Sequence, residues 1–153
     1  AGRKFEMIAW TYFDRMGRFP GASSNNVLIS GNPKSDIDNA KFINPPENPV
    51  TIGSYNFHVF YGNDGTRNVI VVCKDSTCQT KLEDDEIGFM TAFDTAIDGV
   101  ANGTSGMVRG YNNTLSIDFN KWLVSGINSA DFIDWTSTGD KKALVYYFDR
   151  RPQ

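Results

Sequence analysis

The sequence predicts an α+β domain, because helical and strand patterns occupy separate parts of the chain rather than alternating. Residues 3–16 and 82–99 have the apolar spacing of amphipathic helices, and two strand-like runs lie between them at residues 55–61 and 69–73. This order favours an antiparallel sheet. A length of 153 residues suits a single domain, so residues 1–153 are expected to fold as one unit.

The first helix is predicted over residues 3–16. Its apolar side chains fall at i, i+3, i+4, i+7, i+8 and i+11, namely Phe5, Ile8, Ala9, Tyr12, Phe13 and Met16. Met7 and Trp10 lie beside this stripe and widen the apolar surface, so one sheet is not expected to cover all of it. Gly17 can adopt the left-handed conformation that ends a helix, and Pro20 prevents its continuation.

A long irregular connection is predicted over residues 21–54, which are rich in Gly, Ser, Asn and Pro. Two short apolar pieces interrupt it, at residues 27–29 and 42–43. Loops of this length tend to be functional or mobile.

A hairpin pattern follows the connection. Apolar and other residues alternate over 55–61, residues 62–65 have turn chemistry, and residues 69–73 are a β-branched run that ends in a cysteine. The continuous apolar run favours a strand covered on both faces.

The second helix is predicted over residues 82–99, with acidic residues at 83–86 where they favour the helix dipole. This acidic run is interpreted as a solvated helix start. The apolar stripe consists of Ile87, Met90, Phe93 (or Asp94) and Ile97, and Asp98-Gly99 ends the helix. Short strands are then expected at residues 107–111 and 115–119, and a closing strand at 141–149.

The two cysteines, Cys73 and Cys78, are separated by four residues. The spacing is not that of a C-x-x-C redox motif, and the chain has no second Cys/His pair for a zinc site. A disulfide is the favoured interpretation and indicates an oxidising compartment, and two free thiols are the alternative.

Familiar catalytic patterns are missing, so we expect no catalytic residue, cofactor or metal, and a protein that is not an enzyme. The chain has no G-x-S-x-G motif and no phosphate-binding glycine loop, and its one histidine, His58, is expected to be a structural or solvent-facing strand residue. A net charge of −3 without a basic stripe argues against nucleic-acid binding. No stretch approaches the roughly 18 apolar residues of a transmembrane helix.

Asp94 and Asp98 are spaced i, i+4 and can lie on one helix face. Such a pair can serve glycoside hydrolysis or bind calcium. More often it consists of one exposed acid and one residue that caps or follows the helix end, and all of these interpretations stay open at this point.

Two stretches together resemble type IV pilins and related prepilin-like proteins. Residues 12–21, YFDRMGRFPG, are similar to the segment that ends the first helix in this family, through Tyr12, Asp14, Gly17, Arg18, Phe19, Pro20 and Gly21. Residues 93–110 are similar to an "LDtkIDDG…GxVR" segment found in a subset of the family, through Phe93, Asp94, Ile97, Asp98, Gly99, Gly106, Val108 and Arg109.

The resemblance implies a long N-terminal helix whose apolar first half anchors the precursor in the inner membrane and later packs in a filament. The second half would lie across an antiparallel sheet of about four strands, with a second short helix and long loops, as in pilins. Residues 3–16 would be that second half, so the helix residues Phe5, Ile8, Ala9, Tyr12, Phe13 and Met16 are assigned to filament packing. Other pilin subunits and the inner membrane would be the partners, with surface or glycan ligands in addition.

The expected function is therefore that of a structural subunit, a major or minor pilin, in an extracellular pilus of a Gram-negative bacterium. The family's usual disulfide encloses a C-terminal region, whereas both cysteines here lie mid-chain. Aromatic packing by Trp122, Phe132 and Trp135 is expected to hold the C-terminal part instead.

Three alternatives stay open. The first is a type II secretion pseudopilin in a periplasmic pseudopilus. The second is an adhesin or carbohydrate-binding module, in which Phe42, Tyr111, Trp122 and Trp135 form an aromatic platform rather than core anchors. The third is a small hydrolase that uses Asp94 and Asp98.

Overall fold

The structure is a computed structural model that describes residues 2–23, 31–45, 47–52, 54–64 and 67–149. The apolar piece expected at residues 27–29 and Gly65 of the expected turn lie outside this part of the chain. The α-helices within it are α1 (Gly2–Met16), α2 (Pro33–Asn39) and α3 (Asp84–Asp98). None of these described helices is both long enough and apolar enough to cross a membrane.

Helix α1 matches the expectation from the apolar spacing. It ends at Met16, and Gly17 follows with a φ of 78°, the left-handed conformation that a glycine adopts without steric cost. The Gly17 amide donates to the Phe13 carbonyl at 2.8 Å and so completes the last turn of the helix.

The described strands are β1 (Val50–Ile52), β2 (Tyr55–Asn63), β3 (Asn68–Cys73), β4 (Val108–Tyr111), β5 (Ser116–Asp118), β6 (Leu123–Ser125) and β7 (Ala143–Tyr146). They form a seven-stranded sheet in the order β4-β7-β3-β2-β6-β5, with β1 paired to β2. All of these ladders are antiparallel except the one between β2 and β6. Every residue of β3 is buried, which confirms the expectation of a strand covered on both faces.

The sheet differs from the predicted antiparallel sheet of about four strands, because it is mixed and larger. Strands β1, β5 and β6 have three residues each, too few for a periodic sequence signal. The parallel ladder joins Tyr61 to Leu123 and Gly62 to Val124. Gly62 fits this position because a Cβ there would lie 3.0 Å from the Val124 carbonyl oxygen.

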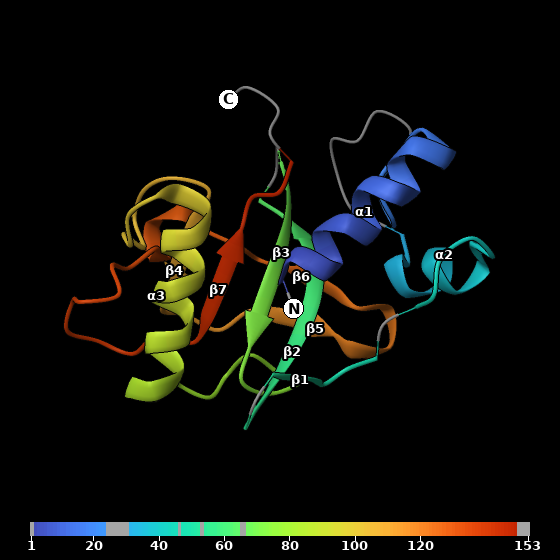
Figure 1. Ribbon diagram of the computed structural model, residues 1–153. Coiled ribbons are helices and arrows are strands. Elements are labelled where there is room, and N and C mark those ends of the chain that lie inside the picture. The colour runs from blue at the N-terminus through green and yellow to red at the C-terminus, as the bar shows by residue number, and fades with distance from the viewer. Residues whose placement is uncertain (1, 24–30, 46, 53, 65–66, 150–153) are drawn as a thin grey trace.

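Helices α1 and α3 cover the same face of the sheet (Figure 1). Tyr146 of β7 connects them, since its hydroxyl donates to Glu6 of α1 at 2.7 Å and its ring lies 5.5 Å from the ring of Phe93 of α3. On the opposite face, the ring of Phe60 lies 6.2 Å from that of Phe119. The core therefore lies mainly between the sheet and the two helices, and Phe119 packs against the opposite face of the sheet.

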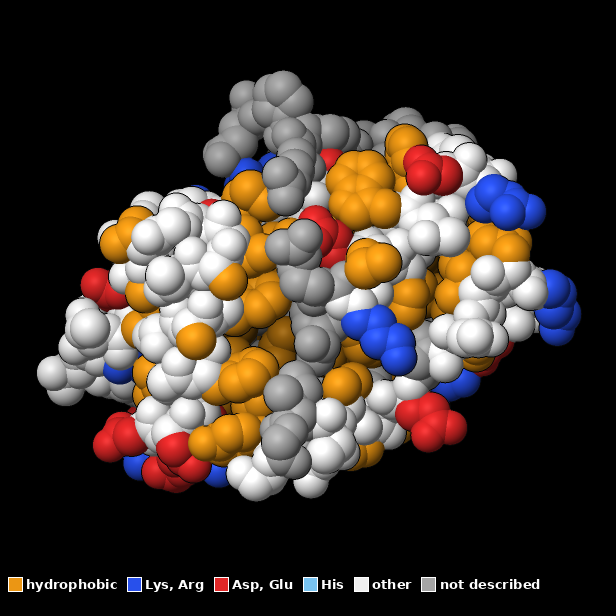
Figure 2. Space-filling model, in the orientation of Figure 1, with side chains coloured by type: hydrophobic (Ala, Val, Ile, Leu, Met, Phe, Trp, Pro, Cys, Tyr) orange, Lys and Arg blue, Asp and Glu red, His pale blue; other side chains and the backbone are white. Residues whose placement is uncertain are grey.

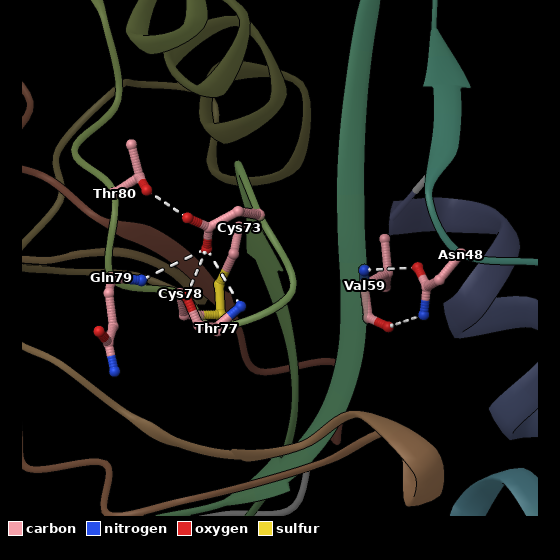
Figure 3. Close-up of a disulfide and its surroundings, with 8 residues drawn as sticks. Asn48, Val59, Cys73, Thr77, Cys78, Gln79 and Thr80 are labelled. Carbon is pink, nitrogen blue, oxygen red and sulfur yellow. Dashed lines mark hydrogen bonds between the residues drawn. A yellow bond between two sulfur atoms is a disulfide. The ribbon is translucent and has the colours of Figure 1, made fainter.

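The 21–54 connection contains more regular structure than its composition predicts, because α2 and β1 form within it. Helix α2 begins with Pro33 at its first turn, and the Asn32 side chain accepts from the Ser35 amide at 2.9 Å. Asn48 holds the following stretch to the edge of β2, where its side chain exchanges hydrogen bonds of 2.8 and 2.9 Å with the backbone of Val59 (Figure 3).

Candidate functional site

Helix α1 is the first candidate site, and its inward face is part of the core of the domain. Of the six residues assigned to filament packing, the structure buries Phe5, Ile8, Ala9 and Tyr12, half-buries Phe13 and leaves Met16 exposed. The Tyr61 hydroxyl donates to the Phe5 carbonyl at 3.1 Å, so backbone as well as side chains join the helix to the sheet. Most of the assigned set is therefore enclosed by the domain itself.

The outward side of α1 carries an apolar groove. Met7 is 67% exposed and lies on the side of the helix away from the sheet. A groove of about 360 Å³ runs beside it, lined by Lys4, Met7, Ile8, Thr11, Phe42, Ile43 and Asn44. Figure 2 shows hydrophobic side chains interrupting the polar surface over α1 and beside it. The second wall of the groove comes from the apolar piece at residues 42–43, whose contribution the helix pattern alone does not predict.

The first motif, residues 12–21, places the end of α1 on the rest of the domain. The rings of Trp10, Phe13 and Phe148 surround that of Phe19, at centroid distances of 5.0, 4.8 and 5.2 Å. Aromatic contacts of this kind add to the apolar area that they bury. The motif therefore fixes the end of α1 on the rest of the domain.

An ion pair fastens the same segment to α2. Arg18 binds Asp36 at 2.8 Å, and the same carboxylate accepts from the Gly21 amide at 2.7 Å. The hydrogen bond to Asp36 raises the pKa of Arg18 further above its ordinary value. Both partners are partly exposed, so the pair contributes orientation more than stability.

The second motif contains the Asp94–Asp98 pair, and neither residue has the role of a free surface acid. Asp94 is completely buried, and its Oδ2 accepts from the indole Nε1 of Trp135 at 2.8 Å and from the Asn102 amide at 2.9 Å. Asp98 accepts from the amides of Met107 and Val108 at 3.1 and 3.0 Å. The pair therefore holds the loop that follows α3, and enclosure of Asp94 leaves no access for a substrate.

The side chains of α3 that face the core differ from the apolar stripe that the sequence predicts. The expected apolar stripe included Phe93 or Asp94, and the structure buries Glu86, Met90 and Asp94, whereas Ile87, Phe93 and Ile97 are half-buried. The prediction that the acidic run is a solvated helix start is wrong for Glu86. Its side chain belongs to a capping box, in which it accepts from the Glu83 amide at 2.8 Å. The same carboxylate also forms an ion pair with Lys74 at 3.1 Å.

Glycines of the second motif allow close approach of neighbouring groups. A Cβ on Gly106, which has a φ of 75°, would lie 2.4 Å from Oδ2 of Asp98. Cβ atoms on Gly103 and Gly110 would lie 2.1 and 2.4 Å from the carbonyl oxygen of Ile133. Close packing therefore requires glycine at positions 103, 106 and 110.

The predicted disulfide between Cys73 and Cys78 is present, and both cysteines are buried (Figure 3). Asp75 organises the enclosed loop, where it accepts from the Thr77 amide at 3.1 Å, the Gln79 amide at 3.4 Å and the hydroxyl of Thr80. Burial raises the pKa of Asp75, but these hydrogen bonds outweigh it and hold that pKa below its ordinary value.

The candidate aromatic platform does not form an open surface. Tyr111, Trp122 and Trp135 are buried, and of the four proposed residues only Phe42 is exposed, where the guanidinium of Arg15 lies 4.5 Å from its ring. The alternative that these aromatics are core anchors is confirmed for the three buried residues. Of the residues expected to hold the C-terminal part of the chain by packing, Trp122 and Trp135 are buried, and Phe132 is half-buried with its ring 6.2 Å from that of Tyr147.

His58 is half-buried in β2, and its Nδ1 is buried and has no hydrogen-bond partner among the residues that the structure describes. Burial lowers the pKa of His58 from its ordinary value. Within the described part of the chain, no group of three or more His, Cys, Asp or Glu side chains is arranged to hold a metal ion.

No protein-family model, curated protein or solved structure matches the chain. The site must therefore be interpreted from its own geometry.

Proposed function

We propose that this chain is the globular part of a structural subunit of a type IV pilus filament, with α1 as the element through which subunits pack. The observation that carries the proposal is the division of α1 into two faces. One face is buried in the domain and includes Phe5, Ala9 and Tyr12, and the other presents Met7 and an apolar groove to the outside.

The two motifs of the family resemblance support the proposal through what they build. Residues 12–21 end α1 and fix it against α2, and within residues 93–110 the carboxylates of Asp94 and Asp98 hold the loop between α3 and β4. Neither segment presents a catalytic arrangement, and both determine the position of structural elements. A protein that acts by assembly needs a helix held rigidly on its domain, because the helix transmits contacts from one subunit to the next.

An apolar helical segment continuous with α1 is part of the proposal. In such a subunit the added segment would occupy the filament core, and the groove of residues 4–11 and 42–44 would lie at the border between neighbouring heads. A type II secretion pseudopilin would use the same surface, and the two assemblies differ in the compartment where the filament forms.

The experiment compares two exposed side chains of nearly equal accessibility in the full-length gene. Met7 is 67% exposed in the groove, and Val100 is 65% exposed after α3. Each is replaced by lysine in the bacterium that carries the gene, and the chain is quantified in sheared extracellular filaments and in the periplasm. We expect Met7→Lys to reduce the filament-associated fraction at least tenfold, and Val100→Lys to leave it unchanged.

Thermal unfolding of both purified domains accompanies the assay, because an exposed lysine should not change stability by more than about 0.5 kcal/mol. Wild-type chain found as a dispersed monomer in every fraction would refute the proposal. Equal assembly of both variants would show that the groove is not the packing surface. Filaments confined to the periplasm would identify the pseudopilin instead of the pilus.

A further inference from the structure

In the acid pair on α3, Asp94 is buried and Asp98 half-buried, and one oxygen of Asp94 has no evident role. Oδ2 of Asp94 accepts two N–H groups, whereas Oδ1 of Asp94 is buried and has no hydrogen-bond donor among the described residues. The carboxyl group of Asp98 lies within hydrogen-bond reach of Asp94. Two carboxyl groups, both hydrogen-bond acceptors when ionised, are therefore in contact, and the Asp94 side chain is closed to water.

Two ionised carboxylates at this distance would repel each other strongly, because little solvent separates them. Either a proton or a cation must lie between them. A cation needs several oxygen ligands, and the described part of the chain offers no third acidic, histidine or cysteine side chain here. The remaining oxygens of the pair already accept backbone and indole N–H groups. A proton satisfies the unpaired oxygen without any further ligand.

The other charged groups around the pair do not change this conclusion. On the 133–141 segment, Asp134 accepts from the Gly103 amide at 3.2 Å and adds negative charge nearby. On β4, Arg109 donates through Nε to the Gly106 carbonyl at 2.7 Å, and its guanidinium lies over the rings of Phe132 and Tyr147. Among the ionisable groups of these elements, Asp98 is the one that acts on Asp94.

We propose that Asp94 and Asp98 share one proton, and that this proton keeps residues 99–108 folded against α3. The loop depends on the pair because the carboxylates receive the amides of Asn102, Met107 and Val108, which lie at both ends of it. Loss of the proton leaves two negative charges in contact and weakens the same hydrogen-bonded framework. The loop is therefore a pH-sensitive element of the surface beside β4.

The direction of the pH dependence follows from burial and from the neighbouring acid. Burial, and after it Asp98, raises the pKa of Asp94 from 3.8 to about 6, against the opposing hydrogen bonds from Trp135 and Asn102. A folded-state pKa above the unfolded value means that the folded protein binds the proton more tightly. This stabilisation is complete below the unfolded-state value of 3.8 and is lost progressively as the pH rises from there through about 6.

The test starts with the unmodified protein, so it does not depend on how any variant folds. Carboxyl carbons are followed by NMR between pH 3 and 8, and we expect Asp94 to titrate near 6 rather than near 3.8. A midpoint for Asp94 below about 4.5 would overturn the proposal, because an unshared buried carboxylate that accepts two N–H groups titrates low. The amides of Asn102, Met107 and Val108 should shift with the same midpoint.

A matched pair of variants tests the consequence for stability. Asp94→Asn keeps one acceptor oxygen and replaces the protonated oxygen by an NH₂ donor towards Asp98, so it mimics the proton-sharing state. Relative to Asp94→Asn, we expect the melting temperature of the wild type to fall between pH 5 and pH 7.5, and the opposite contribution of His58, whose pKa burial lowers, is common to both proteins. Asp14→Asn on the exposed side of α1 is the control and should retain the wild-type pH dependence.

A cation instead of a proton would produce a different result. Addition of 1 mM calcium at pH 7.5 should leave the melting temperature of the wild type unchanged. A calcium-dependent increase in the wild type that is lost in Asp94→Asn would replace the shared proton by a metal site.

Discussion

Replacement of Phe5 by alanine should show which face of α1 holds the domain together. The Phe5 side chain is completely buried, and its ring lies 6.0 Å from that of Tyr61 and 6.2 Å from that of Trp122. A buried Phe→Ala change removes transfer free energy and leaves a cavity, which together cost about 3–5 kcal/mol. For a domain of this size each kcal/mol lowers the melting temperature by about 2–4 °C, so we expect a decrease of about 10 °C.

The control is Met7→Ala, two residues along the same helix. Met7 is 67% exposed, so its truncation should change the free energy of unfolding by less than about 0.5 kcal/mol. Urea unfolding followed by far-UV circular dichroism and tryptophan fluorescence measures both variants. Similar losses for the two variants, or a loss below about 1 kcal/mol for Phe5→Ala, would refute the division of α1 into a buried and an exposed face.

Two further predictions concern the segments that fasten the fold. Gly106→Ala should cost about 1–3 kcal/mol in chemical denaturation, because the residue has a φ of 75° and its new Cβ would meet a carboxyl oxygen of α3. Gly88→Ala, in open space on α3, should instead stabilise by about 0.5–1 kcal/mol, and a loss there would contradict the assignment. Reduction of the Cys73–Cys78 disulfide should lower the free energy of unfolding by about 2 kcal/mol in the chain-entropy model. Non-reducing mass analysis should find no alkylatable thiol, and labelling at both cysteines would show that the bond is absent.

The pH behaviour of the acid pair has a consequence for the proposed assembly. A subunit that passes between compartments of different pH would keep the loop 99–108 tightly folded in the more acidic one. The two proposals can nevertheless fail separately, since the titration of Asp94 is measured on the monomeric domain and the filament assay varies Met7.

Local elements could be predicted because they depend on short-range patterns. The apolar spacing in α1, the stop at Gly17 and the β-branched run of β3 each lie within a few residues, and the structure has all of them. The same holds for the Cys73–Cys78 disulfide, whose partners are five positions apart.

Pairings between distant residues could not be predicted from these patterns. The mixed sheet depends on three-residue strands and on a parallel contact of β2 with β6, which only packing selects. Several roles stay open for Asp94 in the sequence, and only the fold brings Trp135, 41 positions later, to it. A helical period identifies which side chains share a face, but it does not identify what that face contacts.

The amino-acid sequence by itself determined the positions of α1, β2, β3 and α3, because backbone preference and side-chain periodicity act over one or two turns of chain. The tertiary structure alone decided that one side of α1 is core and the other is groove. It also decided that Asp94 is enclosed beside Asp98. Burial depends on every group that packs around a residue. Those groups come from distant parts of the chain, and a local sequence pattern does not show that they will meet.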